Sequence, residues 1–419
     1  STWTDEEGNE KVIATTQFES TNARRAFPCF DEPDLKASFG VTLRVDESLM
    51  AISCGELVSS TDLGGGRRED RFADTMVMST YLVAFIVGEL EATEAVDVDG
   101  VPLRIVHVPG KGDLTEFALE AGEFSLRWLV QYYDIPYPAG KLDLVAVPDF
   151  AFGAMENLGC VTFRETLLLA DPQRSTQTEM TRIVDVIAHE IAHMWFGNLV
   201  TMDWWNGIWL KEAFATFMHV ATTDAFRPQW RRWDGFCVER GAAFDTDSLA
   251  STRPIEFEVI SPEDAEAMYD ILTYEKGAAV VRMLEQFLGS AQFRSGVKHY
   301  LTSHSYANTT TTDLWDSLEH ASGVPVRAAM DTWIFQGGHP VVAVEATSEG
   351  ISLKQSRFGY SSVDPTSWHI PIIIRAQVGS EQVEKRVLLE GNEEEIDLGG
   401  TPQWAVVNAG GHGFYRVTY

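Results

Sequence analysis

The stretch HEIAHMWFGNLVTMDWWNGIWLKEAFATF, residues 189–217, carries two histidines four positions apart, with a glutamate directly after the first. Residues four apart on a helix lie one turn above each other on the same face, so the imidazoles of His189 and His193 can reach one ion. Glu190 lies about 100° round the helix, beside such an ion, where it can act as a base toward water. The spacing therefore predicts a metal site on a helix.

The residues around this stretch predict the helix itself. Thr176 followed by Glu179 is a capping-box pattern, and Gly197 offers a C-terminal stop. Between them, apolar residues recur along one face: Ile183, Val186, Ile187, Ile191 and Met194. A second helix over residues 207–226 carries Glu212, which we expect to be the third ligand. Two histidines and one glutamate leave a position open, as in catalytic zinc sites.

The same pattern also has a purely structural interpretation, a buried helix with two hydrogen-bonded histidines. The chain contains 10 histidines, and short motifs of this kind also arise by chance. The longer metzincin pattern does not continue, because Phe196 and Leu199 stand where it needs glycine and histidine. A third ligand must then be a downstream carboxylate, and Glu212 has apolar neighbours on its helix.

Composition limits the classes of function. The chain has 419 residues, enough for two or three domains, and its 62 acidic and 32 basic residues give a formal net charge of -30. This charge repels phosphate backbones, so we expect no nucleic-acid partner. No apolar run is long enough to span a bilayer, and no signal-peptide pattern is present, although the chain starts at Ser1 and an upstream segment is expected. The four widely spaced cysteines are typical of reduced thiols and predict a cytoplasmic location.

Periodicity divides the chain into three parts. Residues 1–109 are mostly short runs of alternating polar and apolar residues, which predict β-structure. Helical spacing of apolar residues prevails over 110–339, with a strand expected before the segment GAMENLG at 153–159. Alternation returns over 340–419, as in a small β-sandwich. We expect these three parts to be domains.

Several motifs together resemble the gluzincin zinc aminopeptidases of the aminopeptidase N family. HEIAH is followed after eighteen residues by Glu212, and GAMENLG lies upstream. QFESTNARRAFPCFDEP at 17–33, TYEKGAAVVRML at 273–284 and GFYRVTY at 413–419 are similar to further family segments. The resemblance covers the whole chain. It implies an α+β multidomain fold, with a β-saddle domain, a thermolysin-like and mainly helical catalytic domain, and a small β-sandwich.

The resemblance also implies a reaction, the removal of single residues from peptides with a free N-terminus. One zinc ion per chain, held by His189, His193 and Glu212, would lower the pKa of water to about 7, and Glu190 would accept and return the proton. Tyr274 would hydrogen-bond the oxyanion formed from the peptide carbonyl. Without the resemblance, Tyr274 reads as a core residue of its helix.

An aminopeptidase must also recognise the substrate's ammonium group, and carboxylates suit that task. The resemblance assigns Glu156 to the amine, with Glu19 as a second contact. It assigns the backbone at Gly153 and Ala154 to the substrate's main chain, which can approach closely where glycine has no side chain. Without the resemblance, Glu19 reads as a solvated strand residue.

The sequence departs from the family pattern beside the third ligand. Lys211 and Ala213 flank Glu212 where the family more often has asparagine and glycine. Because neighbours on a helix do not share a face, we expect zinc binding to be unaffected. Family members also have about a hundred further residues before this chain and often a helical domain after it, so further domains are expected. Two alternatives stay open: a bifunctional aminopeptidase and epoxide hydrolase, and a catalytically inactive scaffold.

Overall fold

The computed structural model describes residues 1–5 and 7–419, which form two compact units. Unit 1 comprises Ser1–Trp205, Met218–Trp233 and Leu301–Thr309, and unit 2 comprises Asn206–Phe217, Asp234–Tyr300 and Thr310–Tyr419. The long helix α3, Ile208–Phe226, contributes its first part to unit 2 and its last part to unit 1. The three predicted domains, with boundaries after residues 109 and 339, stay a prediction.

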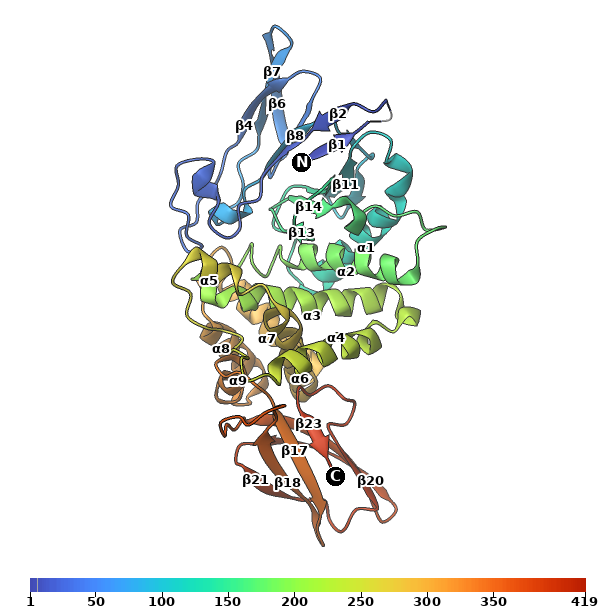
Figure 1. The fold of residues 1–419 in the computed structure, drawn as a ribbon, viewed down its shortest axis with the longest axis vertical. Coiled ribbons are helices and arrows are strands. Elements are labelled where there is room, and N and C mark those ends of the chain that lie inside the picture. The colour runs from blue at the N-terminus through green and yellow to red at the C-terminus, as the bar shows by residue number, and fades with distance from the viewer. Residues whose placement is uncertain (6) are drawn as a thin grey trace. The chain divides into compact units, whose positions relative to one another are not determined.

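The N-terminal part of unit 1 consists of small antiparallel sheets (Figure 1). They are β1 (Thr2–Thr4) with β2 (Glu10–Val12); β3 (Ala14–Thr15), β8 (Phe85–Gly88) and β5 (Met50–Ser53); and β4 (Thr42–Asp46), β7 (Arg67–Phe72) and β6 (Leu57–Gly64). Gly64, the last residue of β6, and the turn residues Gly65 and Gly66 all have positive φ. Glycine adopts this left-handed backbone without steric cost, so the glycine run sets the hairpin. The β-structure predicted here is present.

A mixed sheet follows in unit 1, in the order β10-β11-β12-β14-β13, with β9 also paired to β11. Its strands are β9 (Glu91–Ala92), β10 (Val96–Val98), β11 (Val101–His107), β12 (Leu142–Val147), β13 (Ala154–Met155) and β14 (Cys160–Arg164). Helix α1, Glu116–Tyr133, connects β11 to the parallel β12 and contacts both β11 and α2. Every residue of β12 is buried, as is typical of strands in parallel sheets. Strand β14 was not predicted, because periodicity does not distinguish a short strand whose first four residues are all buried from a helix segment.

Helix α2, Gln177–Ala192, begins as predicted. Thr176 and Glu179 form the reciprocal hydrogen bonds of a capping box. The helix ends five residues before Gly197, so the predicted stop was wrong. His193 is the C-cap but keeps helical dihedral angles, and its N–H donates to the His189 carbonyl, so the one-turn spacing of the two histidines is retained. Strand β15, Thr201–Met202, then pairs with β16, Asn308–Thr309.

Unit 2 combines helices with two C-terminal sheets. Its helical elements are α4 (Arg232–Asp247), α5 (Pro262–Glu266), the π-helical turn η7 (Leu272–Lys276), α6 (Gly277–Leu288), α7 (Ser290–Ser303), α8 (Thr311–Ser322) and α9 (Val326–Ile334). The first two residues of α4 and the last three of α7 belong to unit 1. The sheets have the orders β21-β18-β17-β23 and β20-β19-β22. Their strands are β17 (Pro340–Ala346), β18 (Gly350–Arg357), β19 (Ile370–Val378), β20 (Glu381–Leu389), β21 (Glu393–Asp397), β22 (Trp404–Val407) and β23 (Arg416–Thr418). The α+β fold class is thus confirmed.

Candidate metal centre

The end of α2 presents the two predicted histidines. The Nδ1 of His193 lies 2.9 Å from the backbone oxygen of Phe196. A carbonyl can only accept, so Nδ1 must donate, and in the neutral ring Nε2 is left with the lone pair that a metal needs. Metal-binding histidines usually donate one ring N–H to a backbone carbonyl or a carboxylate in this way.

His189 is oriented by a third histidine, His219 on α3. Their Nδ1 atoms lie 3.2 Å apart. For His189 to offer Nε2 to a metal, its Nδ1 must donate and His219 Nδ1 must accept, so His219 must be neutral with its proton on Nε2. Burial, together with the neighbouring His189, holds the pKa of His219 well below its usual value, in agreement with a neutral ring.

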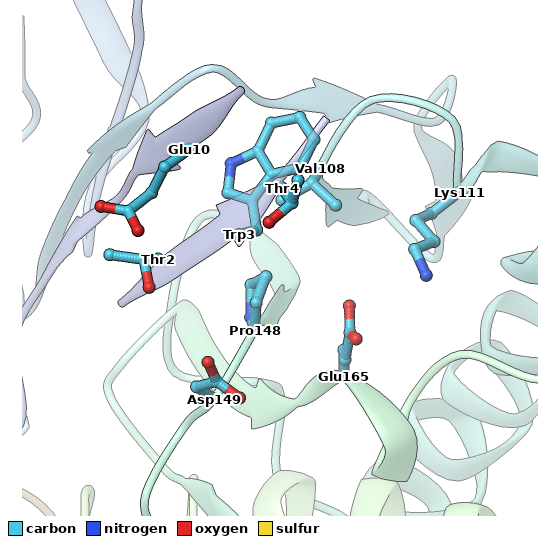
Figure 2. A pocket seen from close by; sticks show the side chains of 9 residues that line it. All are labelled: Thr2, Trp3, Thr4, Glu10, Val108, Lys111, Pro148, Asp149 and Glu165. Carbon is cyan, nitrogen blue, oxygen red and sulfur yellow. The ribbon is translucent and has the colours of Figure 1, made fainter. Parts of the chain in front are cut away.

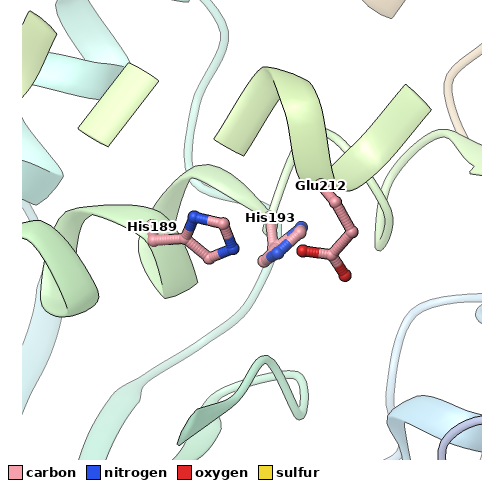
Figure 3. Close-up of side chains that lie close together, drawn as sticks. All are labelled: His189, His193 and Glu212. Carbon is pink, nitrogen blue, oxygen red and sulfur yellow. The ribbon is translucent and has the colours of Figure 1, made fainter. Parts of the chain in front are cut away.

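The three predicted ligands lie close together. His189, His193 and Glu212 each offer one ligand atom, and these atoms all lie within 4.8 Å of one another. Figure 3 shows the far nitrogen of the His189 ring directed toward His193 and Glu212. Two imidazole nitrogens and one carboxylate oxygen are the donor set of catalytic zinc sites, so these residues fit that ion.

The flanking lysine contradicts one expectation from the sequence. Lys211 Nζ lies 2.9 Å from Glu212 Oε1, and the two side chains are 1% and 4% exposed. The sequence predicts that these helix neighbours point to different faces. The Cα positions do lie about 100° apart, but the four-carbon stem of lysine is long enough to bring the ammonium group back to the adjacent carboxylate. The cation therefore contacts the predicted third ligand directly.

Further carboxylates gather around the same atoms. Glu156, Glu190 and His193 form one group whose ligand atoms lie within 4.8 Å of one another, and Glu19, Glu156 and Glu212 form another. Glu156, Glu190 and Glu19 are all buried. Glu19 lies in a turn, so its reading as a solvated strand residue was wrong.

The edge strand β13 presents backbone groups of the GAMENLG segment. Among the described residues, no strand pairs with the side of β13 that faces away from β14. The carbonyl of Gly153 accepts a hydrogen bond from the Arg164 N–H. Because backbone groups alternate in direction along an antiparallel pair, the N–H and C=O of Ala154 point to the unpaired side. Ala154 can therefore bind an extended peptide, whereas the Gly153 carbonyl is already engaged.

Tyr274 lies in the π-helical turn η7, and π-turns often occur at functional sites. Three residues later, Gly277 begins α6 in close contact with α3. A Cβ atom added to Gly277 would lie 2.6 Å from the Cβ of Ala213, so only glycine permits this approach. The contact fixes the segment that carries Tyr274 against the residue that follows Glu212.

A pocket of about 340 Å³ occurs elsewhere in unit 1 (Figure 2). It is lined by Thr2, Trp3, Thr4, Glu10, Val108, Lys111, Pro148, Asp149 and Glu165. None of the predicted site residues lines this pocket, so we do not assign the chemistry of the metal centre to it.

Two residues of the site were missed by the sequence analysis. His219 lies seven positions after Glu212, a spacing that places both on one helix face, and this signal was available. Asn198 donates from Nδ2 to the backbone oxygen of Glu156 at 2.9 Å and so connects the segment after α2 to GAMENLG. No local pattern predicts that contact, because 42 positions separate the two residues.

The fold and the cluster define an α+β protein with a two-histidine, one-carboxylate candidate metal centre. A sequence profile of the Peptidase family M1 domain matches residues 117–333, and one of the Peptidase M1 N-terminal domain matches residues 1–82. The chain therefore belongs to peptidase family M1.

Similar proteins are named as aminopeptidases. The chain is 41% identical to a puromycin-sensitive aminopeptidase of Caenorhabditis elegans, with 100% of this chain and 45% of that protein covered. It is 40% identical to aminopeptidase M1 of Arabidopsis thaliana (98% and 48% covered) and 37% identical to endoplasmic reticulum aminopeptidase 1 of Homo sapiens (100% and 48%). The chain thus spans about half the length of these relatives. None of its described helices is long and apolar enough to cross a membrane.

Proposed function

We propose that this chain provides the catalytic centre of a zinc aminopeptidase, which hydrolyses the first peptide bond of peptides with a free N-terminus. The observation that carries the proposal is the convergence of His189, His193 and Glu212, with ligand atoms within 4.8 Å of one another. The names of the relatives support the same class of activity. The thiol state of the four cysteines, none of which forms a disulfide among the described residues, supports the prediction of a cytoplasmic protein.

Glu190 is the proposed general base and acid. When bound, zinc would supply Lewis acidity that makes water acidic enough to lose a proton near neutral pH. The Glu190 carboxylate belongs to the same group of ligand atoms as His193 and Glu156, which supports its assignment as the group that takes that proton. It would then return the proton to the leaving amine, which needs one to depart as a neutral group.

Recognition of the substrate is assigned to two sets of groups. Glu156 and Glu19 are buried carboxylates in one group, and a substrate ammonium placed between them would form charge-assisted hydrogen bonds. The N–H and C=O of Ala154 at the edge of β13 would pair with the substrate's main chain, as when a strand is added to a sheet. The ammonium contacts would allow only the first residue to lie before the scissile bond.

Tyr274 is the proposed donor to the oxyanion. The contact between Gly277 and Ala213 fixes the turn η7 relative to α3, which carries Glu212. A phenol held in this way could donate its O–H to the developing negative charge without reorganising.

The proposal is tested with matched peptides that differ only in an N-terminal acetyl group. The native chain, expressed with zinc, should cleave the free peptide, and acetylation should suppress cleavage by orders of magnitude because it removes the ammonium charge. The control is Glu190→Gln, which should keep about one zinc per chain but lose turnover. Equal cleavage of both peptides, or a native chain without zinc after metal supplementation, would refute the proposal. A panel of aminoacyl fluorogenic amides would then define the preferred first residue.

A further inference from the structure

The pocket of Figure 2 lies beyond the carboxyl ends of the parallel strands in the mixed sheet of unit 1. Val108 follows β11, Pro148 and Asp149 follow β12, and Glu165 follows β14, and all four residues line the pocket. Strands β11, β12 and β14 are parallel, so these residues lie at the same edge of the sheet. In open α/β sheets, small molecules usually bind in the crevice outside the carboxyl ends of the strands. The position of the pocket therefore favours a ligand site.

The pocket also has the size of a small-molecule site and an unsatisfied donor in its wall. Its volume of about 340 Å³ lies at the lower end of the range for such sites. The hairpin of β1 and β2 contributes Thr2, Trp3, Thr4 and Glu10 to the lining. The Nε1 of Trp3 is shielded from solvent and has no hydrogen-bond partner in the described part of the chain. A buried donor without a partner costs free energy, which an acceptor on a bound molecule would relieve.

The charged groups of the pocket have no partners within the described chain. The carboxylates are those of Glu10, Asp149 and Glu165, and the ammonium group is that of Lys111. Among residues 1–5 and 7–419, none of these four groups forms an ion pair or a side-chain hydrogen bond. Figure 2 shows Lys111 and Glu165 on one side of the pocket, and Glu10 and Asp149 on the other. The pocket therefore presents separated charges of both signs to a ligand.

This arrangement suits an extended zwitterion better than a single metal ion. Among the described residues, the three carboxylates do not form a group whose ligand atoms all lie within 4.8 Å of one another, as the ligands of one ion would. Separated carboxylates instead match two separate positive charges, and Lys111 matches a carboxylate. A free basic amino acid carries two cationic groups and one carboxylate. Its aliphatic stem can pack against Trp3 and Pro148, which also line the pocket.

We propose that this pocket binds a free basic amino acid such as lysine. Lys111 binds the α-carboxylate, Glu165 binds the α-ammonium group and Asp149 binds the side-chain cation. None of the predicted site residues lines the pocket, so this binding does not require the metal centre. Under the proposed function, the ligand is also a product of the reaction, released from peptides with a basic first residue.

The test measures the dissociation constant of L-lysine for the 419-residue chain by ligand-observed NMR titration. The value should be on the order of 1 mM, as expected for so small a ligand. Asp149→Asn and Lys111→Gln should each raise it about three- to tenfold, because each removes one charge-assisted contact at a partly exposed site. Asparagine tolerates the left-handed backbone at position 149, where φ is 51°, so this variant should fold. If circular dichroism shows it unfolded, Glu165→Gln takes its place with the same expected change.

A matched control separates this effect from the loss of any nearby charge. Asp113 is an exposed carboxylate two residues after Lys111 and does not line the pocket. Asp113→Asn should leave the dissociation constant of lysine within about twofold of the native value. An effect of Asp113→Asn as large as that of Asp149→Asn would overturn the proposal. So would changes below about twofold in both pocket variants.

Two analogues of lysine test which group of the ligand meets which residue. Cadaverine lacks the carboxylate, and norleucine lacks the side-chain cation. Lys111→Gln should therefore weaken the binding of lysine but not that of cadaverine, and Asp149→Asn should weaken the binding of lysine but not that of norleucine. If each variant weakened all three ligands by the same factor, the proposed contacts would be wrong.

The ammonium groups of lysine also match the carboxylates at the proposed metal centre, so a further variant separates the two sites. Glu156→Gln removes a charge proposed to bind the substrate's ammonium group, and binding in the pocket should persist there within about twofold. If Glu156→Gln abolished lysine binding while Asp149→Asn and Lys111→Gln left it unchanged, lysine would bind at the metal centre and the proposal would be wrong. A chain that binds lysine in the pocket but cleaves no peptide would support this site and refute only the proposed function.

Discussion

The buried pair of Lys276 and Asp247 gives a prediction whose size can be worked out. Lys276 Nζ lies 2.9 Å from Asp247 Oδ2, and both side chains are 0% exposed. Burial acts to raise the pKa of Asp247, but the charge of Lys276 and hydrogen bonds from His339 and Thr252 hold it below its usual range. Lys276→Met keeps an apolar stem of similar length and removes the charge. Asp247 then lacks its main counter-ion.

Protonation of the Asp247 carboxyl group limits the loss of unfolding free energy in Lys276→Met. At about pH 7, the solution lies roughly three pH units above the ordinary pKa of aspartate, and at about 1.4 kcal/mol per unit, protonation costs about 4 kcal/mol. This agrees with the 3–5 kcal/mol that usually follows when one partner of a buried pair is removed. In Lys276→Met, the pKa of Asp247 is higher in the folded state than in the unfolded state. The unfolded state therefore binds fewer protons, and stability falls as pH rises. At about pH 5 the loss should therefore shrink to roughly 1.5 kcal/mol.

Urea-induced unfolding measures this loss. The native chain, Lys276→Met and the double variant Lys276→Met/Asp247→Asn would be compared at about pH 7 and pH 5 by circular dichroism, with midpoints read at constant slope. The double variant buries no charge at this position. Its free energy of unfolding should therefore fall less below that of the native chain, and by nearly the same amount at both pH values. A single-variant loss below about 1 kcal/mol, or equal losses at the two pH values, would show that Asp247 is stabilised without the lysine.

Four further predictions concern the proposed site and its surroundings. Tyr274→Phe should slow turnover by about a hundredfold or more and leave KM nearly unchanged, and an unchanged turnover number would make Tyr274 a core residue. Glu212→Ala should lose zinc by elemental analysis, whereas Glu190→Gln should retain it, and the reverse result would exchange their roles. Glu156→Ala should cleave free peptides more slowly and show a smaller penalty for acetylation, by about 2–5 kcal/mol, and full retention of the penalty would assign the amine to another group. Burial lowers the pKa of His339, so the unfolded state binds more protons than the folded state below about pH 6.5. The free energy of unfolding should fall there by up to about 1.4 kcal/mol for each pH unit of acidification. His339→Asn should reduce this pH dependence in urea titrations.

Local patterns predicted the elements that carry the site. The capping box at Thr176 and Glu179 requires only contacts within one turn, so it was readable from the sequence and is present. The end of α2 differs from the prediction, because the helix ends at Ala192, five residues before Gly197. The N–H of Gly197 instead bonds to the Val200 carbonyl within a short loop that follows the helix. A hydrogen bond that closes such a loop lies outside the helix, so the periodicity of the helix does not predict it.

The contacts between distant segments account for what the sequence did not predict. The spacing of His189, His193 and Glu212 was enough to propose three ligands, and the structure brings them together. Asn198 was missed because its partner lies in another segment. The contact of Lys211 with Glu212 departs from the rule that helix neighbours do not share a face, because the lysine side chain is long enough to reach the adjacent carboxylate.

The burial of α3 explains which polar residues define this site. A helix that is apolar on all sides is buried, and an ionisable group there is retained only where it is paired. In the buried stretch 207–220, Lys211 and Glu212 pair with each other, and His219 contacts His189 on α2. Burial of α3 also restricts its apolar residues. The methyl group of Ala213 fits because the neighbouring Gly277 has no side chain. The three ionisable residues of this stretch therefore each have a partner at or beside the proposed metal centre. Such interruptions in a long apolar helix mark the residues to test first, and in this chain they would have identified His219 from the sequence.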